Sequence, residues 1–208
     1  MKKILIIVIA GILCFSFVQA KTHLPRKFRK QLTENGLQFT LPDSFKKVKV
    51  HKNPDFSYDF AIKHVSKKLE IRYSIIPLAE LAKSYRKSLT DTSIHMINPN
   101  ASFANTLLLV STYNIGDSIL SDIKSFDSSA MKREFGADWG GFAYVIPRKT
   151  FAPDYKYCLI MAIHKDNIAD GYITFLFDNI EDVSHQLYYT SFDNMTFKTL
   201  DDQKYQLN

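Results

Sequence analysis

The sequence predicts an α+β fold in which helices cover both faces of a mainly antiparallel, twisted sheet, as a three-layer α/β/α sandwich. One observation is the order of elements along the 208 residues: strands, then helices, then strands, then a helix. Another is that the late strands are apolar on both faces, as strands inside a covered sheet are. The composition agrees, because 46% hydrophobic residues with seven Gly and seven Pro excludes a disordered or low-complexity chain.

Residues 1–20 have the pattern of a secretory signal peptide. The cationic start Met1-Lys2-Lys3 precedes an apolar run over 4–18, which ends in Val18-Gln19-Ala20 before polar residues. The run, which includes Cys14, is shorter than the roughly 20 apolar residues of a membrane-spanning helix. We therefore expect cleavage after Ala20, export to the periplasm or the extracellular space, and no transmembrane anchor after cleavage.

After residue 20 the sequence predicts one domain without disulfides. Residues 21–35 are rich in Lys and Arg and read as a basic N-terminal arm or a short helix. Residues 36–208 show no repeat and no break in composition, which predicts a single globular domain. Cys158 is the only cysteine beyond the signal peptide, so an internal disulfide is excluded.

The first half of this domain alternates as strands do and then changes period. Strict alternation predicts a strand over 37–41, and Val48 with Val50 suggests a short second strand. Segments 58–64 and 69–75 form a predicted antiparallel hairpin. Its expected buried face consists of Leu69, Ile71, Tyr73 and Ile75.

Helical spacing begins near Pro77. We expect a helix starting at Pro77 and running to Leu89, a second helix over 101–113, and a third that Asp127 caps and Gly136 terminates. Strands are then predicted over 142–146, 157–164 and 171–177, the last two joined by a loop over 165–170. A final helix and a closing strand over 195–197 complete the order; the helix is marked by Ile180, Val183, Leu187 and Ser191.

This order resembles the PsbP-like, or Mog-type, domain. The resemblance covers about residues 36–200 and is carried by the opening Leu37-Gln38-Phe39-Thr40-Leu41-Pro42, by the hairpin that leads to Pro77 and a helix, and by the late strand pair followed by a helix and a short strand. It implies a protein-binding or assembly role, as in photosystem accessory proteins, a small-GTPase binder and chaperones of secreted effectors. No residue here matches a binding motif of that family, so the resemblance implies no particular site residues.

The formal charge of +6 is unevenly distributed. Basic residues greatly outnumber acidic ones over 21–90, and acidic residues are in excess from 91 onward. Such a charge difference is compatible with solvated faces, or with a basic N-terminal part that meets an acidic partner or an anionic surface. Nucleic acid is excluded as a partner, because an exported chain without a recognised binding motif does not meet it.

Catalytic and cofactor signatures are absent from the sequence. Cys158 and His164 fall on the same face of one strand, roughly 20 Å apart and beyond hydrogen-bond reach, so we expect Cys158 to be buried and inert. Two Ser-x-x-Lys patterns lack the accompanying motifs of penicillin-recognising enzymes. No glycine-rich phosphate loop is present, and we predict no cofactor.

No metal site is predicted either. His164-Lys165-Asp166 places two potential ligands on one strand face, which is too few for a site, and His164 reads as a strand-end side chain. The loop from Asp166 to Gly171 lacks the oxygen ligands of a calcium loop, so it is interpreted as a polar hairpin turn.

The one candidate binding site surrounds the only tryptophan. Asp138, Trp139 and Gly140 lie in a glycine-rich loop, with Tyr144 and Arg148 nearby on the next strand. A Trp in such a loop either anchors a partner or ligand, or packs over a sheet edge. We expect an exported, non-enzymatic domain that binds another envelope or secreted protein. The alternatives are a small-ligand or lipid carrier with a cleft between sheet and helices, and a hydrolase built on Cys158 or a histidine–carboxylate pair.

Overall fold

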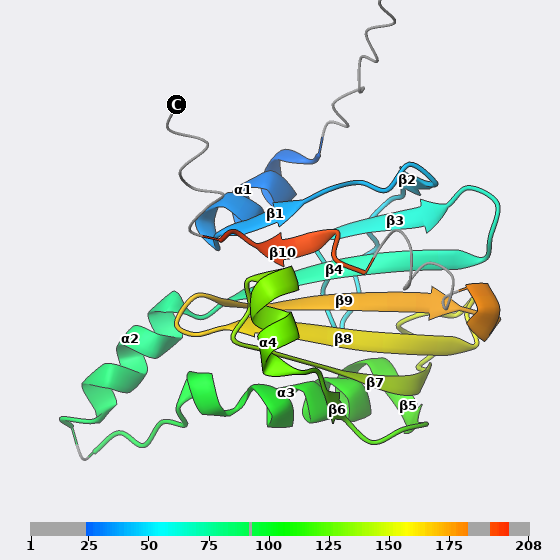
Figure 1. Ribbon diagram of the computed structural model, residues 1–208. Coiled ribbons are helices and arrows are strands. Elements are labelled where there is room, and N and C mark those ends of the chain that lie inside the picture. Colours follow the sequence, from blue (N-terminus) through cyan, green and yellow to red (C-terminus); the bar gives the residue numbers. More distant parts are fainter. Residues whose placement is uncertain (1–23, 92, 183–191, 200–208) are drawn as a thin grey trace, which may run out of the picture.

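The computed structural model describes residues 24–91, 93–182 and 192–199. The expected signal peptide and most of the predicted final helix, including Val183, Leu187 and Ser191, lie outside these ranges. Within them the chain is an α+β protein built on a large antiparallel sheet (Figure 1).

The helical elements occupy the start and the middle of the chain. They are α1 (Arg26–Glu34), α2 (Ala79–Ser88), the single turn η1 (Pro99–Ala101), α3 (Phe103–Leu109) and α4 (Ser128–Ala130). Two wider helical turns, η2 (Val110–Ile115) and η3 (Met131–Phe135), continue α3 and α4. The strands are β1 (Leu37–Phe39), β2 (Phe45–Lys47), β3 (Phe60–His64), β4 (Leu69–Pro77), β5 (Gly116–Ile119), β6 (Lys124–Ser125), β7 (Trp139–Pro147), β8 (Tyr157–Lys165), β9 (Ala169–Phe177) and β10 (Met195–Phe197).

The main sheet has the strand order β2-β3-β4-β9-β8-β7-β5, and the short β6 also pairs with β7. Every pairing is antiparallel. The central strand β9 is paired along its length, because nine residue pairs join it to β4 on one side and nine join it to β8 on the other. β1 and β10 form a separate two-stranded sheet, which brings the two ends of the described chain together.

Both faces of the main sheet are buried. Strand β8 divides between two cores, as alternation requires: Leu159, Met161 and Ile163 belong to one, and Cys158, Ile160 and Ala162 to the other. The first core is closed by side chains of α1, η3, β1 and β10, and the second by α3, η2 and the segment 151–155. The prediction of a late strand covered on both faces is therefore confirmed.

Helix α1 packs into the same core as the residues after 36. Phe28 is fully buried, and its ring stacks on Phe60 with ring centroids 4.6 Å apart. Leu32, one helical turn further along, is buried beside it. The basic residues of this segment stay on the exposed side of α1, so the segment combines a cationic surface with an apolar anchor.

The end signals of the third helix act as the sequence predicts. The Asp127 carboxylate accepts a hydrogen bond from the backbone N–H of Ala130 at 2.9 Å, which caps α4. Gly136 ends η3 in the left-handed region with φ of +59°.

Three local predictions are wrong. The second strand is Phe45–Lys47 rather than Val48 to Val50, because the buried Phe45 fixes the pairing with β3. Pro77 is the last residue of β4, and α2 begins at Ala79. Trp139 is the first residue of β7, so the glycine-rich segment is a strand from there on rather than a loop.

Candidate functional site

A segment between two parts of the sheet forms an arm rich in exposed apolar side chains. This arm, residues 78–109 without the undescribed residue 92, comprises α2, a linking segment, η1 and α3. Helix α2 lies at the end of the sheet that carries the β8–β9 turn, and α3 lies along the sheet (Figure 1). Six of the fifteen exposed large hydrophobic residues of the described chain belong to the arm: Leu81, Leu89, Ile94, Ile97, Leu108 and Leu109. In α2 only Ala82 is buried, so most of this helix does not contribute to a core.

The β8–β9 turn holds the arm at its start, in α2 and at η1. At its start, the Leu78 backbone N–H donates to the Ile168 carbonyl at 2.9 Å. At η1, the Asn167 backbone N–H donates to Asn100 Oδ1 at 2.9 Å, and the Asn167 side chain accepts from Arg86 at 3.1 Å. Asn167 has a φ of 60°, a left-handed conformation that Asn tolerates better than most residues. The short turn between β8 and β9 therefore holds the arm in place against the sheet.

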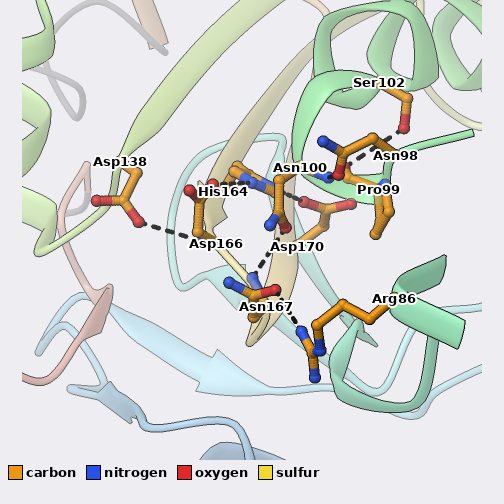
Figure 2. Close-up of polar contacts among 10 residues, drawn as sticks. All are labelled: Arg86, Asn98, Pro99, Asn100, Ser102, Asp138, His164, Asp166, Asn167 and Asp170. Carbon is orange, nitrogen blue, oxygen red and sulfur yellow. Dashed lines mark hydrogen bonds and ion pairs between the residues drawn. The ribbon is translucent and has the colours of Figure 1, made fainter. Parts of the chain in front are cut away.

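His164 forms the buried centre of this attachment. Its Nδ1 lies 2.6 Å from Asp170 Oδ1, and its Nε2 lies 3.0 Å from Asp166 Oδ1. Figure 2 shows the imidazole between the two carboxylates, with Asn167 reaching Asn100 on one side and Arg86 on the other. The Asp166 backbone N–H in turn donates to Asp138 at 3.0 Å. One histidine thus links the end of β8, the turn and the start of β9.

Aromatic packing connects His164 to the arm. The Phe103 ring, at the start of α3, lies 4.6 Å from the imidazole and 4.7 Å from the Trp139 ring system, measured between centroids. Trp139 is opposite His164 in the β7–β8 register. Phe103 is therefore in contact with one residue from each of two neighbouring strands, and it seats α3 on the sheet.

The electrostatics of the site favour a charged imidazole. Burial alone would lower the pKa of His164, but the hydrogen bonds and negative charges of Asp170 and Asp166 outweigh it and raise the pKa above its ordinary value. Both ring nitrogens are engaged by carboxylates, so neither is open to act as a base toward a bound molecule. This arrangement suits a positioning role.

The structure brings part of the predicted site together. Asp138 and Trp139 both belong to the His164 cluster, Asp138 through the Asp166 backbone and Trp139 through Phe103. The Trp139 indole N–H donates to Ser125 Oγ on β6 at 3.2 Å. Gly140 is buried on the opposite side of the strand against Met131, where a side chain would collide with the methionine.

Tyr144 and Arg148 lie elsewhere. Because β7 is extended, Tyr144 is about 16 Å along the strand from Trp139. It lines a surface pocket of about 680 Å³ together with Leu120, Tyr157 and Phe177. Arg148, just beyond β7, donates from Nε to the Gly116 carbonyl at 2.9 Å. The expectation that these two residues accompany Asp138 is therefore wrong.

The other candidates from the sequence have a clear placement. Cys158 is fully buried in the second core, and burial raises the pKa of its thiol, so the reactive thiolate is disfavoured. The described part of the chain contains no group of three or more His, Cys, Asp and Glu side chains placed to hold a metal. In the same ranges, no helix is both long enough and apolar enough to cross a membrane.

Sequence reasoning missed the arm and its attachment. Phe103, Asn100 and Asn167 come from separate segments, and no local pattern joins them. Two signals were present. One is the pair of carboxylates two residues after His164 and six residues after it, and the other is the set of large apolar residues, Leu89, Ile94 and Ile97, in a stretch without regular period.

No protein-family model matches the chain, and no curated protein shows significant similarity to it. The fold alone defines the class of protein, an α+β domain with an antiparallel sheet that is covered on both faces.

Proposed function

We propose that this chain is an exported, non-enzymatic domain that binds another envelope or secreted protein through the arm, residues 78–109. The observation that carries the proposal is the exposure of six large apolar side chains on the arm, which the β8–β9 turn holds at Leu78 and at Asn100. Exposed apolar side chains mark an interaction site where they form a contiguous patch, and we propose that those of the arm form one. A segment held in place before binding also loses little conformational entropy when it binds.

The charges of α2 indicate the chemistry of the partner surface. Lys83, Arg86 and Lys87 are exposed on the same helix as Leu81, with Glu80 as its single acidic residue. A partner surface that is apolar at its centre and acidic at its edge would complement this helix. The resemblance to PsbP-like domains implies the same protein-binding role. As part of the proposal, we also describe the fold as a three-layer α/β/α sandwich of that type.

Affinity capture from the envelope and secreted fractions of the source organism tests this function. The arm variant Leu89→Ser/Ile94→Ser/Ile97→Ser removes three exposed apolar side chains without touching either core. The matched control is Val50→Ser/Val65→Ser, which removes exposed apolar groups outside the arm. We expect a partner that the wild type and the control retain and that the arm variant binds at least about tenfold more weakly.

Two results would contradict the proposal. One is a partner retained equally by the arm variant, which would place the binding surface elsewhere. The other is that no partner is found above background although the immobilised protein is folded, as shown by a melting temperature equal to that of the purified wild type.

A further inference from the structure

A polar pocket lies on the face of the sheet that is covered by the second core, and no residue of the arm lines it. Its volume is about 350 Å³, at the lower end of the range for small-molecule sites. It is enclosed by β4, the segment 48–58 and the segment 150–155. The proposed protein-binding function makes no use of it.

A buried arginine forms one wall of this pocket. The Arg72 guanidinium donates from Nε to Glu70 Oε1 at 2.7 Å and from Nη1 to the Phe151 carbonyl at 2.6 Å. Its central carbon lies 4.7 Å from the Tyr58 ring centroid and 4.8 Å from the Phe151 ring centroid. The arginine side chain is only 8% exposed. Two aromatic rings and a carboxylate therefore hold the guanidinium in one orientation.

The orientation leaves donors for a further ligand. No hydrogen bond from the described residues reaches the remaining N–H groups of Arg72, and Arg72 itself lines the pocket. Glu70, in contrast, also accepts from the Tyr155 hydroxyl at 3.1 Å. A buried ion pair loses much of the hydration energy of both charges, so the Arg72–Glu70 pair contributes little net stability to the fold. This is compatible with a role for Arg72 in binding a ligand.

The pocket rim is cationic. Lys49, His51 and Lys52 line it, and neither lysine forms an ion pair within the described ranges. Asp154 also lines the pocket. The two lysines attract an anion, while Asp154 together with Glu70 opposes a ligand of high negative charge. The balance favours a monoanion over a dianion.

We propose that this pocket binds the carboxylate group of a small organic monoanion, with Arg72 as the recognising residue. A planar guanidinium fork matches a carboxylate in geometry. Val48, which is half-buried, and Pro153, which is exposed, are the apolar residues of the lining that can contact the body of the ligand. Lys49 and Lys52 draw the anion to the mouth of the pocket.

Nuclear magnetic resonance titration with benzoate at constant ionic strength tests the proposal. We expect saturable shifts of the amides of the pocket lining, with a Kd on the order of millimolar, as a ligand of this size allows. The charge reversal Lys49→Glu/Lys52→Glu should weaken binding about two- to fivefold for each charge. Lys46→Glu, compared with Lys49→Glu alone, is the control, because Lys46 is exposed on the adjoining strand β2 and does not line the pocket.

The guanidinium is tested by Arg72→Lys, which keeps the charge and removes the fork. We expect benzoate binding to weaken about ten- to a hundredfold, while Arg148→Lys, a change at an arginine outside the pocket, leaves it unchanged. If Arg72→Lys does not fold, the rim reversal still decides the question. Unsaturable shifts, binding that the rim reversal does not alter, or inorganic phosphate binding more tightly than benzoate would each overturn the proposal.

Discussion

Nδ1 of His164 lies 2.6 Å from Oδ1 of Asp170, and this buried contact joins the end of β8 to the start of β9. The two residues face each other across the β8–β9 hairpin, six positions apart in the sequence. On the other side of the imidazole, Nε2 contacts Asp166, and one ring face meets Phe103. His164 therefore joins the β8–β9 hairpin to the first residue of α3.

The first prediction concerns the pH dependence of stability. The pKa of His164 is raised in the folded protein above its ordinary value of 6.5, so folding favours the protonated form. The resulting stabilisation is complete below the unfolded pKa and is lost as the pH rises through the folded pKa. We expect the free energy of unfolding, measured by urea denaturation, to fall as the pH is raised from about 6 to 9, by about 1.4 kcal/mol for each unit of the pKa difference.

His164→Gln should abolish this fall, and Asp170→Asn should shift it to lower pH. His51→Gln, a change at an exposed histidine, is the control and should preserve it. Burial lowers the pKa of His64, with a smaller contribution from Lys67, so its effect has the opposite sign and is complete above about pH 7. An equal decrease with pH in wild type and His164→Gln would show that His164 does not carry the effect.

The second prediction compares two glycines that share a left-handed backbone. Gly36 and Gly136 have φ values of +62° and +59°. A Cβ at Gly36 would meet no atom within 4 Å, whereas one at Gly136 would lie 2.6 Å from the Phe197 carbonyl oxygen. We expect Gly36→Ala to cost about 1–2 kcal/mol of unfolding free energy, the cost of the conformation alone. Gly136→Ala should cost clearly more, because backbone must move; equal costs would contradict the packing of β10 against η3.

The third prediction concerns the reactivity of Cys158. The thiol is fully buried and its pKa is raised by burial, with Arg72 opposing this rise only in part. Ellman's reagent should therefore label the folded protein very slowly, at the rate of global or local unfolding, and should label it at once in concentrated urea. Labelling of the folded protein at the rate of a free thiol would support a nucleophilic role for Cys158.

Much of the sheet could be predicted because its signals are local. In β8, alternate residues enter two different cores, and the doubly apolar pattern of 157–164 expresses this directly. Asp127 and Gly136 likewise act on neighbouring residues. The second strand is misplaced in the prediction because two alternating valines, Val48 and Val50, are a weak strand signal. The actual strand is fixed by the burial of Phe45 against the sheet, which is a tertiary contact and leaves no local pattern.

Only the part of the candidate site whose residues are adjacent in the sequence could be predicted. Asp138 and Trp139 were expected in a site and lie beside His164. Tyr144 was expected with them, but the strand extends through Gly140 and carries Tyr144 away. Phe103 joins the site through tertiary packing across a long sequence separation, for which no spacing rule exists.

Site-specific photo-crosslinking in the native envelope tests the central proposal most directly. A photoreactive amino acid at Ile97, which is 79% exposed on the arm, is compared with the same residue at Val65, which is 61% exposed on the β3–β4 turn. Binding through the arm predicts one defined crosslinked protein from position 97 and none from position 65. No adduct from position 97, or the same adduct from both positions, would contradict it.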